Sequence, residues 1–175
     1  AMGKGSTQFQ HLVQTEVPPR VLEEWLDLWR AQHHFKEKLK VRLRPRSAGS
    51  ELLELAFLDG EGKTMLNVVF SVIHDRRGRA ILMVRDQNNY DVKLRQKRLM
   101  SLAHLFLLYR YKVGTVHYVA PTEDNLKQAE RMKARGIYGT VNTEISEIIV
   151  ADVNWARVKD LAKPDHVELA ELIKG

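Results

Sequence analysis

The chain contains no cysteine. This absence excludes disulfide bonds, thiolate metal ligands and a cysteine nucleophile. Long apolar runs are missing too, because no stretch is long enough to span a membrane and no signal-peptide pattern is present. We therefore expect a cytoplasmic protein that has no membrane partner.

Acidic residues are outnumbered by basic ones. The formal net charge is +6 at neutral pH, and the isoelectric point is near 9.6. Such an excess favours acidic partners, namely nucleotides, phosphorylated small molecules or nucleic acid. The charge alone does not choose among these three classes.

The first sixteen residues lack the periodic apolar pattern of the rest. Residues 1–16 are polar, and they open on Ala1-Met2-Gly3, which is typical of a cloning scar. We interpret residues 1–16 as a tag and flexible linker. The remaining residues, 17–175, are long enough to form one domain with a substantial core.

Apolar residues at helical spacing predict a helix over residues 20–38, and from Leu39 the period changes to two. Two turn sequences, Asp59-Gly60-Glu61-Gly62 and Asp75-Arg76-Arg77-Gly78, supply the glycines that hairpins need. They join three strands into an antiparallel meander. The predicted strands cover residues 39–44, 52–58, 63–73 and 79–85.

Strands then alternate with helices. After a turn at residues 86–91 the pattern predicts a helix over 91–112, a central strand over 115–120 and a helix that ends at Gly136. Thr122 and Asn125 form a predicted capping box for that second helix. A strand over 147–153 and a C-terminal helix broken near Pro164 complete the chain. This order predicts an α+β fold, with a mostly antiparallel central sheet flanked by helices.

Four cations lie near the start of the predicted helix over residues 91–112, at Lys93, Arg95, Lys97 and Arg98. A helix that begins after a strand attracts anions through its N–H groups and its dipole. One interpretation is therefore a diphosphate clamp. The alternative is a solvated basic face with no ligand, and the sequence leaves both open.

The order of elements from Leu39 to Val153 resembles the GNAT-type N-acetyltransferase fold. In that family a glycine-rich loop before the first of these helices grips the pyrophosphate of coenzyme A. The next helix carries Asn, Ala, Tyr and then Gly-Phe, and here Asn125 and Gly136 keep that spacing. The three glycine places hold Gln96, Arg98 and Met100. The Ala, Tyr and Phe places hold Gln128, Met132 and Ile137. Because methionine cannot donate a proton, the resemblance implies binding of coenzyme A without ordinary acetyl transfer.

A second resemblance rests on longer strings of sequence. They are Glu24–Arg30, Val84–Asn88, Arg98–Met100, His117–Asn125 and Glu147–Asn154. These strings resemble the C-terminal domain of the long-form isocitrate lyases, enzymes of the glyoxylate bypass. The lysine-lysine-cysteine-glycine-histidine loop of the lyase barrel is absent here. The resemblance implies a non-catalytic regulatory domain that dimerises, acts on an attached catalytic domain and binds acetyl-CoA or propionyl-CoA as an allosteric ligand, without a metal.

The predicted acyl-CoA site combines the strand end, the basic helix start and the following helix. It consists of Val84, Lys93, Arg95, Gln96, Lys97, Arg98 and Asn125. No catalytic residue and no metal ligand is predicted for this domain. The seven histidines show no metal-binding spacing, so we assign them structural roles.

Two further functions are weighed against this one. An active N-acetyltransferase would need a different acid or base, such as Glu123 or Tyr138. A nucleic-acid-binding module would use the basic run of residues 42–46 with the arginines of residues 76–79. No nucleic-acid motif accompanies that run, so nucleic acid is the less favoured partner. Of the two tryptophans Trp25 and Trp29, we expect one in the core and one at an interface.

Overall fold

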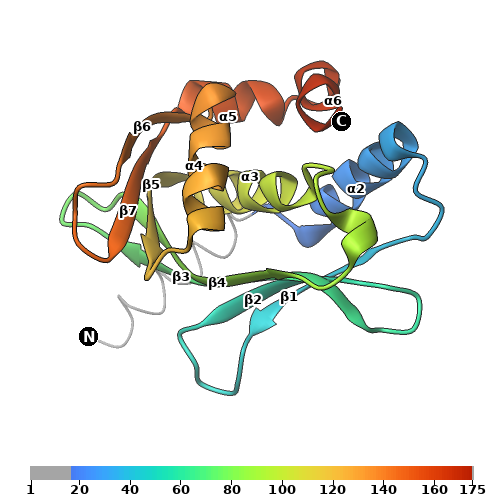
Figure 1. Cartoon of the computed structure of the whole chain (residues 1–175), viewed down its shortest axis with the longest axis horizontal. Helices are drawn as coiled ribbons and strands as arrows, with labels where there is room; N and C mark the ends of the chain where they lie inside the picture. The colour runs from blue at the N-terminus through green and yellow to red at the C-terminus, as the bar shows by residue number, and fades with distance from the viewer. Residues whose placement is uncertain (1–16, 175) are drawn as a thin grey trace, which may run out of the picture.

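A computed structural model of the chain describes residues 17–174. Seven strands form one sheet, and the helices lie over one face of it (Figure 1). The strands are β1 (Lys40–Pro45), β2 (Leu53–Leu58), β3 (Thr64–His74), β4 (Ala80–Asn89), β5 (Val113–Val119), β6 (Tyr138–Asn142) and β7 (Ile148–Val153). The helices are α2 (Pro19–His33), the 3-10 turn η1 (Val92–Leu94), α3 (Leu99–Tyr111), α4 (Glu123–Ala134), α5 (Trp155–Leu161) and α6 (Val167–Ile173).

The strand order in the sheet is β1-β2-β3-β4-β5-β7-β6. Every neighbouring pair is antiparallel except β4 with β5. The predicted α+β class with a mostly antiparallel sheet is therefore confirmed, and so are both hairpins. The sequence patterns did not predict the edge strand β6, which pairs with β7.

The pairing of strand β4 with β5 covers only the first half of β4. The parallel pairing runs from Ala80↔Val113 to Val84↔Tyr118 and ends there. One residue later, at Arg85, a bulge interrupts the pairing of β4 with β3, and that pairing then continues as far as Asn89. Beyond Val84 strand β4 is therefore paired with β3 alone, because β5 ends at Val119, one residue after its last pair with β4.

The prediction of a turn at residues 86–91 was wrong, because β4 extends through Asn89. The side chain of Asn88 donates hydrogen bonds to Asn67 on β3 at 3.1 Å and to Asp86 at 3.0 Å. These polar residues, which usually favour turns, are held in the sheet by partners on another strand.

The predicted helix over residues 91–112 begins eight residues late, at Leu99. Asp91 instead caps the 3-10 turn through the N–H of Lys93, and Arg95 is extended. Gln96 and Arg98 both have left-handed backbone, with φ of 60° and 64°. A regular helix cannot pass through such residues, so Arg95, Lys97 and Arg98 lie on a loop before Leu99, and Lys93 lies in the 3-10 turn.

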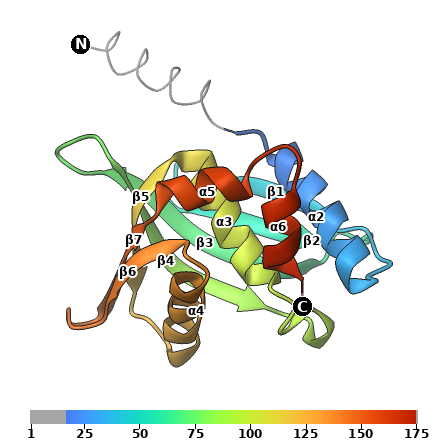
Figure 2. The ribbon, with the colours of Figure 1, turned by 90° about the horizontal axis from the view of Figure 1, so that it is seen from above.

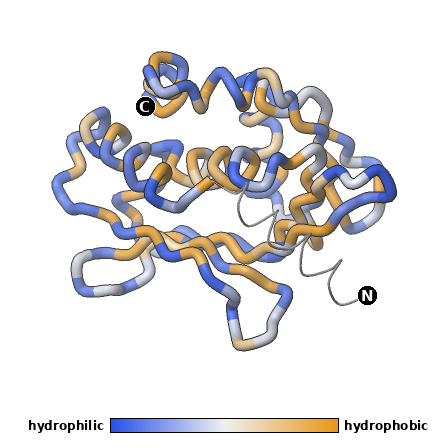
Figure 3. Tube along the Cα trace, turned by 180° about the vertical axis from the view of Figure 1, so that it is seen from behind, coloured by the Kyte–Doolittle hydropathy of each residue, from blue (hydrophilic) through white to orange (hydrophobic). Residues whose placement is uncertain are grey.

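The core lies between the sheet and α2, α3, α5 and α6. Viewed from above, α3 crosses the sheet beneath α5 (Figure 2), and the apolar colour gathers on the sheet and α3 (Figure 3). Trp25 and Trp29 are 1% and 0% exposed, so the expectation that one lies at an interface was wrong. Both are core residues, because α2 turns one face toward α3 and the sheet.

Local signals later in the chain predicted the structure correctly. Thr122 and Asn125 form the capping box of α4, and Gly136 follows the helix with a φ of 78°. The C-terminal helix is broken into α5 and α6 on either side of Pro164. Residues 1–16, interpreted as tag and linker, lie outside the described part of the chain.

Candidate anion-binding site at the start of helix α3

A cavity of about 390 Å³ opens at the start of α3. It lies between the end of β4, the loop before α3, the first turn of α3 and the last turns of α4. It is lined by Asn89, Leu94, Gln96, Arg98, Leu99, Met100, Ser101, Arg131 and Arg135.

The backbone of this cavity presents the N-terminus of a 13-residue helix. The first bond of the helical ladder is donated by Leu102 to the carbonyl of Arg98, at 3.0 Å. The N–H groups of residues 99–101 precede that ladder. No side chain caps them in the described structure. Left-handed Gln96 and Arg98 shape the loop much as glycines would. An uncapped helix start with this geometry is suited to an anion.

Three arginines surround this helix start: Arg98, Arg131 and Arg135. Within residues 17–174, none of the three forms an ion pair with a carboxylate. Burial, followed by the positive charges of Arg98 and Arg131, lowers the pKa of Arg135 to about 10. Arg135 also approaches the hydroxyl of Ser101, with Nη1 and Oγ 3.4 Å apart. The cluster is thus positive and crowded, and no acidic partner for it lies in the described chain.

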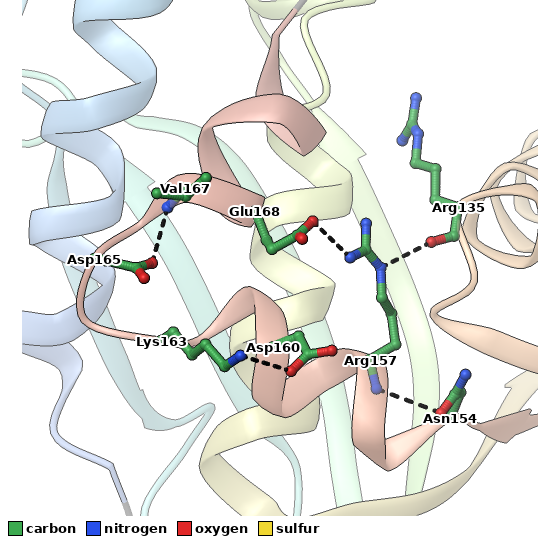
Figure 4. A network of polar contacts seen from close by, with 8 residues as sticks. All are labelled: Arg135, Asn154, Arg157, Asp160, Lys163, Asp165, Val167 and Glu168. Atoms are coloured by element: carbon green, nitrogen blue, oxygen red, sulfur yellow. Dashed lines mark hydrogen bonds and ion pairs between the residues drawn. The ribbon is translucent and has the colours of Figure 1, made fainter.

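The wall of this cavity is braced by the C-terminal helices. Arg157 of α5 donates to the carbonyl of Arg135 at 3.2 Å and pairs with Glu168 of α6 at 2.9 Å (Figure 4). Arg98 donates to the carbonyl of Leu172 at 2.7 Å. Both contacts attach α6 to residues around the site.

The structure brings only part of the predicted acyl-CoA site together. Gln96 and Arg98 line the cavity. Val84 is buried at the last β4–β5 pair, and Lys97 is half-buried with its carbonyl bound by Trp29. Lys93, in the 3-10 turn, and Arg95, directly after it, are exposed and do not line the cavity.

Asn125 serves the capping box at the other end of α4. It lies ten residues before Arg135, roughly 15 Å along the helix. Arg131 and Arg135 were not predicted as site residues. Their spacing of four, on the helix after the basic loop, was the available signal, because residues so spaced share one helix face.

Polar side chains of α3, α4 and the later part of β4 also meet. His104 of α3 hydrogen-bonds Gln87 of β4 at 2.6 Å, and Gln87 donates to Gln128 of α4 at 3.2 Å. Nearby, the ring of Tyr118 stacks on His104, and its hydroxyl bonds that of Tyr138 at 2.7 Å. His104 was assigned a structural role, and it is fully buried in this network.

Two other functional features are absent from the described residues. No cluster of three or more histidine or carboxylate side chains there could hold a metal ion. No helix in that part of the chain combines the length and apolar character needed to cross a membrane.

Two of the arginines considered as a nucleic-acid-binding surface have acidic neighbours, since Arg42 pairs with Glu54 and Arg79 with Asp75.

Comparison with known proteins relates the chain to isocitrate lyases. Over 173 residues it is 57% identical to isocitrate lyase 2 of Mycobacterium tuberculosis (Erdman strain) and of Mycobacterium bovis. It is equally similar to a chain of M. tuberculosis H37Rv that is provisionally named as a subunit of isocitrate lyase. The chain is homologous to a segment of isocitrate lyase 2. The resemblance inferred from the sequence strings is confirmed.

The match covers 99% of this chain but only part of each relative. It spans 23% of the isocitrate lyase 2 chains and 44% of the H37Rv protein. No protein-family profile matches the chain. A crystal structure of a protein of unknown function from Aquifex aeolicus VF5 aligns with 79% of this chain and 84% of its own, with a TM-score of 0.38 and 14% identity.

Proposed function

We propose that this chain is a non-catalytic regulatory domain that binds an acyl-CoA and activates the isocitrate lyase to which it is attached. The observation that carries the proposal is the group of three arginines around the uncapped start of α3, for which the described chain offers no acidic partner. Such a group matches a diphosphate better than it matches a neutral ligand. Homology to a segment of isocitrate lyase 2 supports the link to a lyase.

The position of the site supports acyl-CoA over a free nucleotide. The cavity lies at the start of the helix that follows β4, and in the GNAT-type fold that the sequence resembles the loop before this helix grips the pyrophosphate of coenzyme A. The phosphates would lie against the start of α3 and Arg98, Arg131 and Arg135. Acetyl-CoA and propionyl-CoA are the candidate ligands.

The surroundings favour sensing over transfer. Met132 occupies the position at which acetyltransferases carry the tyrosine that acts as general acid, and it is fully buried. Tyr138, the alternative acid, is also buried, and burial raises its pKa. Glu123, the alternative base, is exposed in the first turn of α4, at the opposite end of that helix from the arginines.

Regulation requires that the ligand bind one arrangement of the parent enzyme better than another. Two partners are proposed for that arrangement: a second copy of this domain, and the catalytic part of the lyase. The contacts of Arg98 and Arg157 with α6 offer one route by which ligand binding could alter the surface of the domain.

Calorimetry with acetyl-CoA, propionyl-CoA and free coenzyme A tests the proposal. We expect saturable binding, and a loss of about 1–3 kcal/mol of binding free energy in Arg135→Gln, because one charged contact is removed. Arg95→Gln is the matched control, since Arg95 is outside the cavity, and its affinity should equal that of the unmodified chain. If none of the three compounds gives a binding heat at saturating concentration, acyl-CoA sensing by this chain is refuted.

A further inference from the structure

Another cavity, of about 350 Å³, lies at the opposite end of α4 from Arg131 and Arg135. The connection from β5 to α4 contributes to one side of it, and the connection from β6 to β7 contributes to the other. A backbone hydrogen bond from the N–H of Ala120 to the carbonyl of Glu147, at 3.0 Å, joins the two connections. We call this cavity the α4–β7 groove. It is lined by Pro121, Thr122, Glu123, Leu126, Thr143, Ile145, Glu147, Ile148 and Ile149.

Aliphatic side chains make up much of the α4–β7 groove. Ile149 is buried, whereas Leu126 and Ile148 are half-buried. Ile145, on the connection between β6 and β7, is 45% exposed. The groove therefore presents adjoining apolar surface to water. Covering such a surface with apolar groups of a partner is favourable, because it removes that surface from water.

Two carboxylates lie beside these aliphatic side chains, those of Glu123 and Glu147. Both residues are exposed, and within residues 17–174 neither forms an ion pair. Glu123 suits the first turn of α4 through the helix dipole, but Glu147 precedes a strand and has no such role. The groove is thus acidic in a chain whose net charge is +6. A cationic group is attracted here and repelled by the arginines at the other end of α4.

The exposure of the lining decides between a small molecule and a protein segment. Five of the lining residues are exposed: Thr122, Glu123, Thr143, Ile145 and Glu147. Small-molecule sites usually bury most of the surface of their ligand, and a lining so exposed gives little enclosure. A side chain presented by a protein needs less enclosure, because the rest of its segment contacts the rim of the groove.

We propose that the α4–β7 groove docks a basic segment of a partner protein, in which a lysine or arginine stands next to aliphatic side chains. The aliphatic side chains contact Leu126, Ile145 and Ile148, and the cation pairs with Glu123 or Glu147. The same two carboxylates repel an acidic segment, so that charge gives the groove its specificity.

This docking site is separate from the proposed acyl-CoA cavity. Glu123 precedes Arg135 by twelve positions, which corresponds to about 18 Å along α4. The partner and an acyl-CoA can therefore be bound at the same time. The inference does not rest on the proposed function.

Three blocked peptides serve as probes: Ser-Leu-Lys-Ile-Ser, Ser-Leu-Glu-Ile-Ser and Ser-Ser-Lys-Ser-Ser. Each is titrated into the isotopically labelled chain, and the backbone amide signals are followed by NMR, which detects weak binding. The first peptide should move the signals of residues 120–126 and 143–149. The other two should leave them in place at the same concentration, because one lacks the cation and the other lacks the aliphatic side chains. Added salt should weaken the binding of the first peptide, because it screens exposed charges.

Variants of the two neighbouring glutamates test the role of the charge. Glu147→Gln should weaken binding of Ser-Leu-Lys-Ile-Ser about two- to fivefold, the range expected for one exposed charge pair. Glu144→Gln is the matched control, because Glu144 belongs to the same connection but does not line the groove, and its affinity should equal that of the unmodified chain. The amide spectrum of each variant also shows whether its fold is kept.

Four outcomes would overturn the proposal. The lysine peptide might leave the signals of the groove in place, or Glu144→Gln and Glu147→Gln could weaken its binding equally. Movement of the same signals with the concentration of the chain alone would assign the groove to a second copy. Binding of the diamine cadaverine as tight as that of the lysine peptide would assign it to a small cation.

Calorimetry of Glu147→Gln with acetyl-CoA keeps this proposal apart from the proposed function. The affinity of this variant for acetyl-CoA should equal that of the unmodified chain, because the acyl-CoA cavity lies at the other end of α4. Weakening of acetyl-CoA binding and of peptide binding to the same extent would show that Glu147 supports the fold, and would overturn its role in docking.

Discussion

Met132 is expected to contribute to the stability of the fold through its buried side chain. Its side chain is 0% exposed between α4 and the core. Met132→Ala should cost about 2–5 kcal/mol of unfolding free energy, because the lost methylene groups leave a cavity. Chemical denaturation measures this. Met100→Ala is the control, since Met100 is only partly buried and should lose less. Stability equal to the unmodified chain would show that Met132 does not pack in the core.

Glu54 makes a pH-dependent contribution to the stability of the fold. Burial raises its pKa, but hydrogen bonds from Asn67 at 2.8 Å and Arg42 at 3.2 Å outweigh burial, so the net pKa is lowered from 4.5. The charged carboxylate therefore stabilises the fold above the unfolded pKa, and this contribution is lost as pH falls through the lowered folded pKa.

Replacing Glu54 by Gln should therefore cost about 1 kcal/mol at pH 7. The difference between the two chains should shrink as the pH falls below 4.5. Denaturation at several pH values, with Glu51→Gln as an exposed control, measures this. A difference that stays constant down to about pH 3, below the usual range of a glutamate, would contradict the role of the Glu54 charge.

At the scale of elements, the loop before α3 carries the main departure from sequence-based expectation. Gln96 and Arg98 hold left-handed backbone that glycine would adopt at lower cost. The arrangement persists because the loop is fixed at both ends, by Asp91 at the 3-10 turn and by Trp29 at Lys97. Local strain is thus balanced by long-range contacts.

Gln96→Gly should therefore raise the unfolding free energy by about 0.5–1 kcal/mol, because relief of the left-handed strain exceeds the entropic cost of glycine. Thermal and chemical unfolding measure this. Lys97→Gly is the neighbouring control, because Lys97 is absent from the left-handed positions and should lose stability. Destabilisation of similar size in both variants would show that Gln96 is not strained.

At the scale of the whole molecule, three hydrogen bonds connect α2, α6 and the loop before α3 to one another. Trp29 Nε1 donates to the carbonyl of Lys97 at 2.7 Å, across 68 positions of the chain. Arg98 donates to Leu172, and His33 of α2 bonds the carbonyl of Ile173, also at 2.7 Å. Helices α2 and α6 and the loop before α3 therefore form one connected unit.

Trp29→Phe should lower the unfolding free energy by about 1–3 kcal/mol more than Trp25→Phe. Both variants lose part of a buried indole, but only Trp29 leaves a carbonyl, that of Lys97, without its donor. Denaturation of the two variants in parallel gives the comparison. Equal losses would mean that the indole hydrogen bond contributes nothing beyond packing.

The sequence by itself determined those features of the structure that depend on interactions between residues close together in the chain. Apolar periodicity predicted most elements, glycine placed the hairpin turns, and Thr122 with Asn125 marked the start of α4. These signals are read within a few positions, because the interactions that produce them are local. The resemblance to isocitrate lyases also lay in the strings themselves.

The tertiary structure alone decided the site. Arg98 and Arg135 are 37 positions apart in the sequence, and only the packing of α4 beside α3 brings them to one cavity. The extension of β4 to Asn89, beyond its last pair with β5 at Val84, depends on pairing with residues 66–69 of β3. The hydrogen bond that Asn88 donates to Asn67 and the one that Trp29 donates to the carbonyl of Lys97 join positions far apart in the chain and override local preference at Asn88 and Lys97. Contacts of this kind carry no periodic signal in the sequence. The grouping of Arg98, Arg131 and Arg135 around one cavity is therefore visible only in the tertiary structure.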